Sequence, residues 1–515
     1  MIYYIPAAGL GKRAEKYTKD LHKTIYPVDH ISTLGRILKM IEIDDEVIIS
    51  VGNKGDQIIE FIKTIYPERK IKIHRAYKEN EEPISLTDTI LKAKKNLNGK
   101  EFIIIPSDTF INDKLNLKKD EVIVKTCLGK CTEYRHITIE NIDGTEKIKF
   151  LDKRKNSKKR KYCYSGIAHI SDSKKFFQTL EKENNELSEI NYLMKSDVKL
   201  IEKSWYDVGN IIAVKLIIKE SKYNILDKED EYIGFENNKV WKYSKTSQKK
   251  IANRSKLLSP YSPIMYCKSK FLVYKMEDGI TLSNLVNRKI NKKLLNHLSN
   301  FWELDGKNIN KESLNFYKNK TLERVRLLEK QDIKKIENIE IINKIQVEKI
   351  GKIIKKIDFE KLSCYSKNTK KWHGDLHYEN ILLNKSRFIL LDHRSSFDKL
   401  TTGDIYYEFA KLLHGIIINH RAIRENNYSI NISDGEIEIK IDKYKDIISI
   451  LKDTLMESKK YGLEEEILAT HLFLVLINIA PLHHKPYQEF LVSLAKMVYK
   501  YKDQKDGIIK VVRTL

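Results

Sequence analysis

Residues 372–380 form the most specific string in the sequence, and they combine histidines, acids and an amide (Trp-His-Gly-Asp-Leu-His-Tyr-Glu-Asn). An apolar run at residues 388–391 follows, and Asp392 ends it. A carboxylate, an amide shortly after it and an acid on the next strand suit phosphoryl transfer. Asp375 would face an acceptor hydroxyl, while the side chains of Asn380 and Asp392 would bind Mg²⁺. The alternative is a structural loop that has lost its chemistry, but all three chemical positions are present.

A second candidate site opens the chain, where residues 7–13 follow a short apolar strand at residues 2–5. Small residues let a backbone approach a ligand closely, and successive backbone N–H groups in such a loop form a cradle for an anion. Cationic side chains add charge-assisted contacts to phosphates. A glycine pair alone is also compatible with an ordinary tight turn. The small residues are Ala8, Gly9 and Gly11, and the cations are Lys12 and Arg13.

Two acids and a lysine further along could complete this first site. Asp108 comes directly after a predicted buried strand at residues 102–106, where a carboxylate is costly unless it binds something. Asp207 lies in a Trp-Tyr-Asp-Val-Gly run, and Lys23 follows His22 at a distance that lets its loop return to the glycines. Two carboxylates from separate strands can hold one Mg²⁺ that grips substrate phosphates. The alternatives are a helix-capping acid for Asp108 and a surface-turn acid for Asp207.

With these motifs, residues 1 to about 220 resemble the nucleoside-triphosphate transferase family of sugar-1-phosphate and choline-phosphate nucleotidyltransferases. The loop at residues 5–13 looks like the family's signature, and His22-Lys23 stands where the family usually has Pro-Lys. The run at residues 85–89, which contains Thr87, is similar to a helix start near the nucleotide base. Asp152-Lys153 resembles a Glu-Lys pair whose lysine meets the acceptor phosphate. Asp108 and the run at residues 205–209 resemble the two metal-acid motifs.

The resemblance implies an α/β fold, with a Rossmann-like (GT-A-like) sheet and helices on both faces. It also implies that an acceptor phosphate attacks the α-phosphorus of a nucleoside triphosphate and that pyrophosphate leaves. Arg13 and Lys23 would then act catalytically with Lys12, Lys153 would position the acceptor, and Mg²⁺ would lie on the two acids. Such catalysis is mostly positioning and electrostatics.

The C-terminal motifs, over about residues 230–500, look like the aminoglycoside phosphotransferase and choline kinase family, whose fold is protein-kinase-like, α+β and bilobal. The resemblance implies that Asp375 is the catalytic base, with a second Mg²⁺ on Asn380 and Asp392. His373 would brace the loop. The run at residues 275–282 is similar to the hinge that meets adenine, which implicates Glu277, and Lys242 stands in the strand that usually carries a phosphate-binding lysine. The small lobe departs from the pattern, because no glycine-rich loop precedes Lys242 and no acid occurs at residues 244–275.

The length of 515 residues predicts more than one domain, and we expect a nucleotidyltransferase domain at 1–222, a kinase small lobe at 223–283 and a helical large lobe at 284–515. The net charge of +24 favours polyanionic partners such as nucleotides and phosphorylated substrates. A lysine-rich solvated surface is the alternative reading. Nucleic acid is not expected, because no aromatic-basic RNA-binding motif is present.

We expect a cytoplasmic protein without a membrane span. The N-terminus shows no secretory signal, and five sparse cysteines form no disulfide framework. The apolar run near residues 467–482 is interrupted by polar residues and is predicted to be a buried helix. The sequence leaves open whether the protein forms a homo-oligomer.

A kinase makes the phosphomonoester that a nucleotidyltransferase consumes. We therefore expect a bifunctional enzyme that uses ATP and then CTP, with Mg²⁺ at both sites, to activate a choline-like amino alcohol or a polyol for surface polysaccharide, such as a capsule, or for lipid. A sugar with another nucleotide, and a regulatory protein with a degenerate kinase lobe, are the rival hypotheses. Trp302, Phe316 and Tyr317 could form an aromatic cage for a quaternary ammonium, although core packing fits their helical spacing better.

Overall fold

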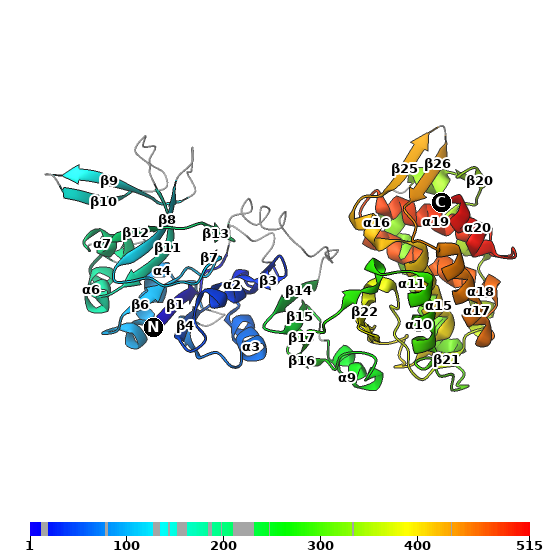
Figure 1. Ribbon diagram of the computed structural model, residues 1–515, viewed down its shortest axis with the longest axis horizontal. Coiled ribbons are helices and arrows are strands. Elements are labelled where there is room, and N and C mark those ends of the chain that lie inside the picture. The colour runs from blue at the N-terminus through cyan, green and yellow to red at the C-terminus, as the bar shows by residue number, and fades with distance from the viewer. Residues whose placement is uncertain are drawn as a thin grey trace. The chain divides into compact units, whose positions relative to one another are not determined.

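The structure of the protein is a computed structural model. It describes residues 1–11, 19–77, 81–126, 134–142, 145–151, 162–183, 188–196, 198–209, 231–246, 248–331, 334–433 and 435–515. The chain forms two compact units, drawn as ribbons in Figure 1. The first unit is Met1–Ser247 with Cys267–Met276, and the second is Gln248–Tyr266 with Glu277–Leu515. Each unit has its own elements and is described by itself.

The first unit is built on a nine-stranded sheet in which four strands at one side are parallel. Their order is β5–β4–β1–β6, and antiparallel β11, β9 and β10 continue the sheet beyond β6. β6 follows β4 and β5 in sequence but lies on the other side of β1, so the strand order reverses between β1 and β6. Ligands of open α/β sheets bind at the carboxyl ends of the strands at such a reversal. The strands of this sheet are β1 Ile2–Ala7, β4 Glu46–Val51, β5 Ile71–Arg75, β6 Phe102–Ile104, β8 Glu121–Thr126, β9 His136–Ile142, β10 Thr145–Leu151, β11 Tyr162–Ile170 and β12 Lys199–Glu202.

Helices cover both faces of this sheet, as the sequence predicts. Side chains alternate along a strand, so Tyr3 and Ile5 of β1 pack with α2 and α3, whereas Tyr4 packs with α4, α5 and α6 on the other face. The sequence has helical spacing over residues 85–94, but the structure has two helices there, because the backbone N–H of Ala93 bonds back to Ile90 and Leu91 and closes α4. The helices are α2 Thr33–Met40, α3 Gly55–Ile65, α4 Leu86–Lys92, α5 Lys94–Leu97, α6 Ser173–Glu183 and α7 Ser188–Met194.

Residues 141–144 (Asn-Ile-Asp-Gly) are a hairpin-turn signal in the sequence, and the strands on either side of them are paired. β9 and β10 are antiparallel, with Thr145 opposite Ile142, and they extend from the sheet as an arm in Figure 1. Residues 143–144 of the turn lie outside the described residues. Short elements at the edge of the site complete this part: η2 Lys23–Ile25, β2 Pro27–Val28, β3 Ile31–Ser32, β7 Thr109–Ile111 and β13 Trp205–Asp207.

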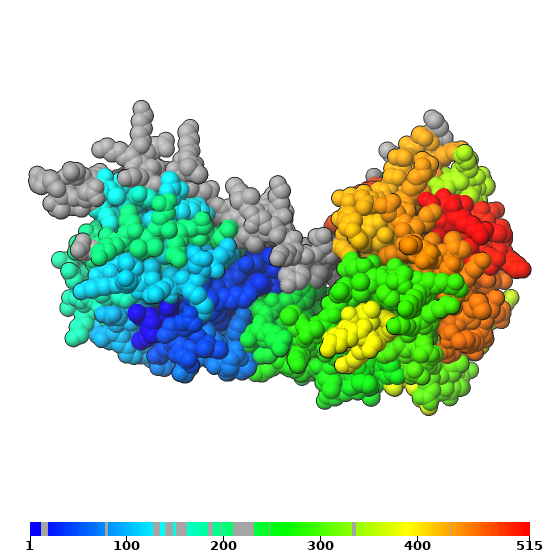
Figure 2. All heavy atoms as spheres, viewed as in Figure 1, coloured from blue at the N-terminus to red at the C-terminus, as the bar shows by residue number. Residues whose placement is uncertain are grey.

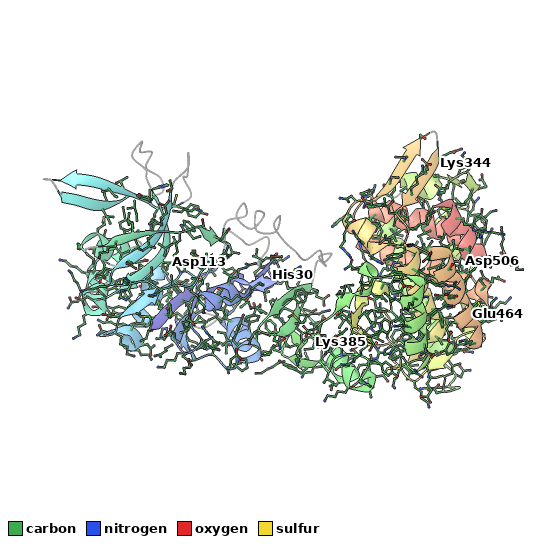
Figure 3. All side chains as sticks on the ribbon, viewed as in Figure 1. His30, Asp113, Lys344, Lys385, Glu464 and Asp506 are labelled. Carbon is green, nitrogen blue, oxygen red and sulfur yellow. The ribbon has the colours of Figure 1, made fainter. Side chains whose placement is uncertain are left out.

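A second, antiparallel sheet in the first unit has the order β14–β15–β17–β16. Its strands are β14 Glu231–Glu236, β15 Lys239–Ser244, β16 Tyr266–Lys268 and β17 Phe271–Lys275. The Trp241 ring meets Phe61 of α3 edge-on, with centroids 5.2 Å apart. His30, labelled in Figure 3, accepts a backbone hydrogen bond of 2.6 Å from Phe235. Figure 2 shows the green atoms of this sheet against blue N-terminal atoms.

One buried carboxylate ties this small sheet to the larger one. Glu236 accepts hydrogen bonds from the backbone N–H and hydroxyl of Ser32 (3.1 and 2.8 Å), the Tyr66 hydroxyl (2.5 Å) and Trp241 Nε1 (2.7 Å). The contacts thus group residues 231–247 and 267–276 with the N-terminal half and residues 248–266 with the C-terminal half. The three domains expected from the sequence, with limits at 222/223 and 283/284, stay predictions.

The second unit is mainly helical around one large core. Its helices are α9 Lys249–Leu258, α10 Arg288–Ser299, α11 Asn310–Lys330, α12 Lys334–Asn338, α13 Ile350–Lys356, α14 Phe359–Cys364, α15 Ile405–Ile417, α16 His420–Arg424, α17 Ile447–Lys460, α18 Glu465–Ile479, α19 Tyr487–Lys500 and α20 Gly507–Thr514. Three 3-10 helices are η3 Leu282–Asn284, η4 Tyr378–Asn380 and η5 Ala480–Leu482. The strands are β18 Ile280–Thr281, β19 Ile341–Ile342, β20 Ile345–Gln346, β21 Asn368–Thr369, β22 Ile381–Asn384, β23 Arg387–Leu390, β24 Gly403–Asp404, β25 Tyr428–Ser433 and β26 Glu436–Ile441.

Helix α18 is the one segment in the described part of the chain that is long and apolar enough to cross a membrane. Its apolar window, Glu465–Leu482, is 72% buried inside the structure, where it packs with α11, α15 and α19. That burial agrees with the core helix predicted near residues 467–482.

Candidate active sites

The glycine loop lies at the carboxyl end of β1, next to the strand-order reversal. Ala8 is buried, and its carbonyl accepts a hydrogen bond from the Tyr77 hydroxyl. A Cβ added at Gly9 would meet no described atom within 4 Å, so space is open in front of the loop. Gly11 has φ +70°, a left-handed conformation that favours glycine. The predicted cations Lys12 and Arg13 lie outside the described residues.

Lys23 reaches the predicted metal acid directly. Its Nζ lies 2.6 Å from Asp108 Oδ2, and the two side chains are 18% and 12% exposed. Lys23 opens η2, which is capped by His22 because the His22 ring accepts a hydrogen bond of 3.1 Å from the Thr24 N–H. Burial, helped by the charge of Lys23, lowers the pKa of His22 to about 3. A neutral His22 can therefore act as the acceptor that fixes Lys23 in place.

The second predicted acid lies beside the first because of one short strand pair. β13 runs antiparallel to β7, which places Asp207 opposite Thr109. The Val208 N–H donates a 2.8 Å hydrogen bond to the Asp108 carbonyl, and the Asp207 carboxylate accepts one of 2.8 Å from Gly209 N–H. Asp108 and Asp207 are 8% and 7% exposed. Two residues that are distant in sequence thus share one end of the sheet.

This donor set fits Mg²⁺ better than a transition metal. The described residues contain no group of three or more His, Cys, Asp or Glu that could hold a metal ion. Mg²⁺ commonly takes only one or two carboxylates and fills its shell with waters and substrate phosphates. Asp108 and Asp207 supply that number of carboxylates, and Lys23 adds a cation for the same phosphates.

A glycine in β11 lets the floor of this site close. Gly166 has φ +85°, and a Cβ there would lie 2.5 Å from Cγ of Pro106, just ahead of Asp108. The ladder between β11 and β8 shifts register at this point. Ser165 holds the bulge, since its hydroxyl donates a 2.8 Å hydrogen bond to the Ile123 carbonyl.

Two further predicted contacts differ in how far the structure describes them. Thr87 is buried in the first turn of α4, where the Ser85 hydroxyl caps the helix by accepting a hydrogen bond from Asp88 N–H. Asp152 and Lys153 lie outside the described residues.

In the second unit, a hairpin unites the residues that the sequence predicts for phosphoryl transfer. β22 and β23 pair antiparallel through a turn at Lys385, labelled in Figure 3. At their open end, Leu391 N–H donates a 2.7 Å hydrogen bond to the Asn380 carbonyl, so Asp392 begins beside Asn380. Asn380 Nδ2 donates to the carbonyl and Oδ2 of Asp375, at 2.9 and 3.2 Å. The base, the amide and the acid of the sequence motif therefore meet in one place.

Lys411 is a site residue that the motif did not reveal. Its Nζ lies 2.6 Å from Asp375 Oδ1. Burial would raise the pKa of Asp375, but the charge of Lys411 and a hydrogen bond from His377 hold it well below its usual range. The available sequence signal is the spacing of Glu408, Lys411 and His414 inside an otherwise apolar helix, α15, which aligns them along one face.

Glu408, less than one turn before Lys411 in α15, holds the loop at residues 373–375. The Glu408 carboxylate accepts hydrogen bonds from His373 N–H (3.1 Å), Gly374 N–H (2.6 Å) and Trp302 Nε1 (3.2 Å). Burial raises the pKa of Glu408 to about 7, against the effect of these bonds. His373 Nδ1 accepts from Asp375 N–H at 3.2 Å. This geometry is what a bracing role for His373 requires.

Of the two residues predicted for nucleotide contacts, one lies on a strand of the small sheet and the other just after one. Lys242 is 6% exposed on β15, paired with Leu272, and alternation puts it on the face opposite Trp241 and Tyr243. Lys242 belongs to the first unit. Glu277 follows β17, is half-buried, and begins a segment of the second unit.

Helix α9 carries a buried arginine and no acid. Arg254 Nε donates a 2.9 Å hydrogen bond to the Thr401 carbonyl, and its guanidinium also donates to the Arg394 carbonyl. Its Cζ lies 5.2 Å from the Trp372 ring centroid. Arg254 thereby attaches the helix to Trp372, Arg394 and Thr401, contacts that the sequence motifs did not indicate.

The three aromatics considered for a cage are core residues. Trp302, Phe316 and Tyr317 are 2%, 8% and 2% exposed. The Phe316 ring packs on Phe397 with centroids 4.3 Å apart, and the Tyr317 hydroxyl donates a 2.7 Å hydrogen bond to Asp404. Core packing, the alternative left open from the sequence, accounts for all three.

No family model and no curated protein matches the sequence. Among solved structures, the chain is similar over 44% of its length to 98% of a Bacillus anthracis protein assigned as a glucose-1-phosphate thymidylyltransferase, with 19% identity and a TM-score of 0.36. It is similar over 42% of its length to 98% of HddC from Yersinia pseudotuberculosis, with 20% identity and a TM-score of 0.32. The chain is also similar, over 44% of its length, to 98% of the inositol-1-phosphate CTP transferase from T. maritima, with 13% identity and a TM-score of 0.32.

Proposed function

We propose that the protein is a bifunctional transferase that acts twice on one small alcohol. The second unit phosphorylates the alcohol with ATP. The first unit then transfers a nucleotidyl group, CMP from CTP, to the phosphomonoester and releases pyrophosphate. The observation that carries this proposal is that each unit gathers the carboxylates and the cation that its own phosphoryl chemistry needs.

In the first unit, Asp108 and Asp207 would hold Mg²⁺, which would offset charge on the α-phosphate. The backbone of the loop at Ala8, Gly9 and Gly11 approaches the triphosphate, and Lys23 contributes its charge from the side of Asp108. An oxygen of the acceptor phosphate bonds to the α-phosphorus, while the bond from that phosphorus to the departing pyrophosphate breaks. Lys12 and Arg13 stabilise the negative charge on the leaving pyrophosphate. Lys153 positions the acceptor phosphate, and Thr87 contacts the nucleotide near its base.

In the second unit, Asn380 and Asp392 would hold Mg²⁺, which would offset charge on the β- and γ-phosphates. Asp375 accepts the proton of the alcohol as the oxygen bonds to the γ-phosphorus, and ADP leaves. A depressed pKa keeps Asp375 ionised for this task. His373 positions the loop. Glu277 would meet adenine at the hinge of this unit, and Lys242, which belongs to the first unit, stays a predicted phosphate contact.

The two reactions form a sequence in which the first product is the second acceptor. ATP and CTP are both cytoplasmic metabolites, so we place the reactions in the cytoplasm. The product is an activated group suited to transfer onto surface polysaccharide or lipid. A sugar with another nucleoside triphosphate remains the alternative substrate pair for the same two sites.

The proposal is tested by assaying ADP and pyrophosphate release separately in the purified full chain. Asp375→Asn should abolish ADP release and leave pyrophosphate release from a supplied phosphomonoester intact, and Asp108→Ala should do the reverse. Two surface acids serve as controls: Asp503→Asn for the first variant and Asp113→Ala, whose side chain is 73% exposed, for the second. Phosphorylation that survives Asp375→Asn would refute the kinase assignment.

A further inference from the structure

We propose that the alcohol phosphorylated at Asp375 carries an anionic group, a carboxylate or a phosphate, and that Lys320 and Arg394 bind it. This inference rests on the proposed kinase function and names the class of its acceptor. Both the amino alcohol and the polyol considered from the sequence lack such a group.

A row of side chains leads from Lys320 to Asp375, the proposed catalytic base. Lys320 Nζ, on α11, donates a 2.9 Å hydrogen bond to the Tyr407 hydroxyl. Tyr407 and Lys411 are one turn apart on α15 and therefore lie on the same face of that helix. Lys411 in turn contacts Asp375 at 2.6 Å. Lys320 is thus separated from the base only by side chains on one face of α15.

Arg394 approaches the same place from the hairpin side. Its backbone N–H donates a 2.9 Å hydrogen bond to the His373 carbonyl, which fixes the arginine beside the catalytic loop. Its Cζ lies 5.6 Å from the centroid of the Phe316 ring, and Lys320 Nζ lies 4.8 Å from that centroid. Arg394 Nε is buried and has no hydrogen-bond partner in the described part of the chain. Two cations from different elements therefore converge on one ring.

Negative charge to balance these cations is scarce. Within the described ranges, no carboxylate lies within 4.0 Å of the Lys320 or Arg394 side-chain nitrogens, and Asp375 faces Lys411. Burial, together with the charges of Arg394 and Lys411, lowers the pKa of Lys320 to about 8. Burial would raise the pKa of Tyr407, but the charges of Lys320, Arg394 and Lys411 lower it to about 8. An anionic ligand would relieve this concentration of positive charge.

The same charges oppose a quaternary ammonium. Such a ligand needs an aromatic face or an anion, and the chain's own Lys320 already lies over both Phe316 and Tyr407, at 4.8 and 5.1 Å from their centroids. A cationic acceptor at Asp375 would meet Lys411 as well. Discrimination against choline-like alcohols therefore follows from repulsion, not from size.

The test compares four small alcohols of different charge in the full chain with ATP and Mg²⁺: glycerol, glycerate, glycerol 3-phosphate and choline. We expect kcat/KM for ADP release to be highest for one of the two anions, and the comparison of glycerate with glycerol 3-phosphate identifies which anion the site takes. Equal or faster turnover of choline or glycerol would overturn this inference and leave the kinase proposal intact. If none of the four is phosphorylated, and no other alcohol is, both fail together.

Three variants at two lysines of α11 separate acceptor binding from folding and from ATP binding. Lys320→Met should raise KM for the anionic acceptor about 10-fold or more, because a charge-assisted hydrogen bond is lost, with KM for ATP and for glycerol unchanged. Lys320→Arg should recover most of that loss. Lys318→Met, at an exposed position on the same helix, should change nothing. If Lys320→Met instead raises KM for ATP, or if it is folded and keeps the wild-type KM for the anion, Lys320 does not bind the acceptor.

Discussion

Replacing Lys411 by methionine should weaken phosphorylation and shift its pH dependence. Lys411 and Asp375 form a 2.6 Å ion pair in which 5% of the lysine side chain and 27% of the aspartate side chain are exposed. Methionine fills a similar buried volume, so the substitution mainly removes charge. Asp375 then keeps its position in the loop but loses the partner that favours its ionised form.

The structure sets the size of the effect on stability. Breaking a fully buried ion pair costs about 3–5 kcal/mol, whereas a hydrogen bond to a charged group contributes about 1.5–3 kcal/mol. Because Asp375 retains partial exposure, we expect a loss of about 2 kcal/mol in the free energy of unfolding at neutral pH. The pair lowers the pKa of Asp375 in the folded state, so its contribution is complete above the unfolded pKa and is lost as pH falls through the folded one. The stability difference between wild type and variant should therefore vanish in acid.

The activity assay follows ADP release across the acid and neutral range. In Lys411→Met the pKa of Asp375 should rise, so the acid limb of kcat/KM should move to higher pH and the rate at neutral pH should fall about tenfold or more. Lys496→Met is the matched control. Lys496, on α19, is also a buried lysine, but it donates hydrogen bonds to the Ile336 and Ile339 carbonyls and not to a carboxylate. It should lose stability without moving the acid limb. A folded Lys411→Met enzyme with the wild-type acid limb would refute the role assigned to this pair.

Three further predictions concern stability and the first site. Gly166→Ala should lower the free energy of unfolding by about 2–4 kcal/mol and slow pyrophosphate release, since its Cβ would lie 2.5 Å from Pro106 and its φ is +85°. Thermal unfolding and the pyrophosphate assay check this. Gly99→Ala, with no atom nearer than 4.0 Å to the new Cβ, controls for the left-handed φ alone. Glu236→Ala should destabilise the first unit by about 3 kcal/mol or more, because it leaves the buried partners of the carboxylate unpaired. Urea unfolding measures this loss, and a value below about 1 kcal/mol would show that these hydrogen bonds do not stabilise the unit. Because the pKa of Glu408 is raised to about 7 in the folded protein, the free energy of unfolding should fall by about 3 kcal/mol as pH rises from the unfolded pKa through 7. Glu408→Gln should remove this pH dependence, and an unchanged pH dependence in the variant would contradict the assignment.

Much of the first unit follows from local sequence patterns. The mostly apolar run at residues 46–51 predicts a strand, which is β4, and the helical spacing of residues 56–65 predicts a helix, which is α3. The continuous apolar run at residues 2–5 fits a strand that is buried on both faces, as β1 is. Local patterns suffice here because each strand and helix is specified by its own periodicity.

The contacts that the sequence did not reveal are long-range. Trp241 reads as one more strand aromatic, and nothing near it indicates that its partner is Phe61 of α3. Nothing in the sequences of α15 and α9 indicates that Lys411 contacts Asp375 or that Arg254 contacts Trp372, and only the packing of these helices brings the residues together. A motif identifies groups that react, whereas the charges that tune them come from elements distant in the chain.

The most direct test of the two-site account is Mn²⁺ binding measured by electron paramagnetic resonance with each nucleotide in turn. With CTP, the full chain should bind Mn²⁺ in a manner lost in Asp207→Asn and retained in Asp392→Asn. With a non-hydrolysable ATP analogue, the pattern should be the reverse. If one substitution removed both signals, or if neither removed its own, the protein would not hold two separate metal–nucleotide centres.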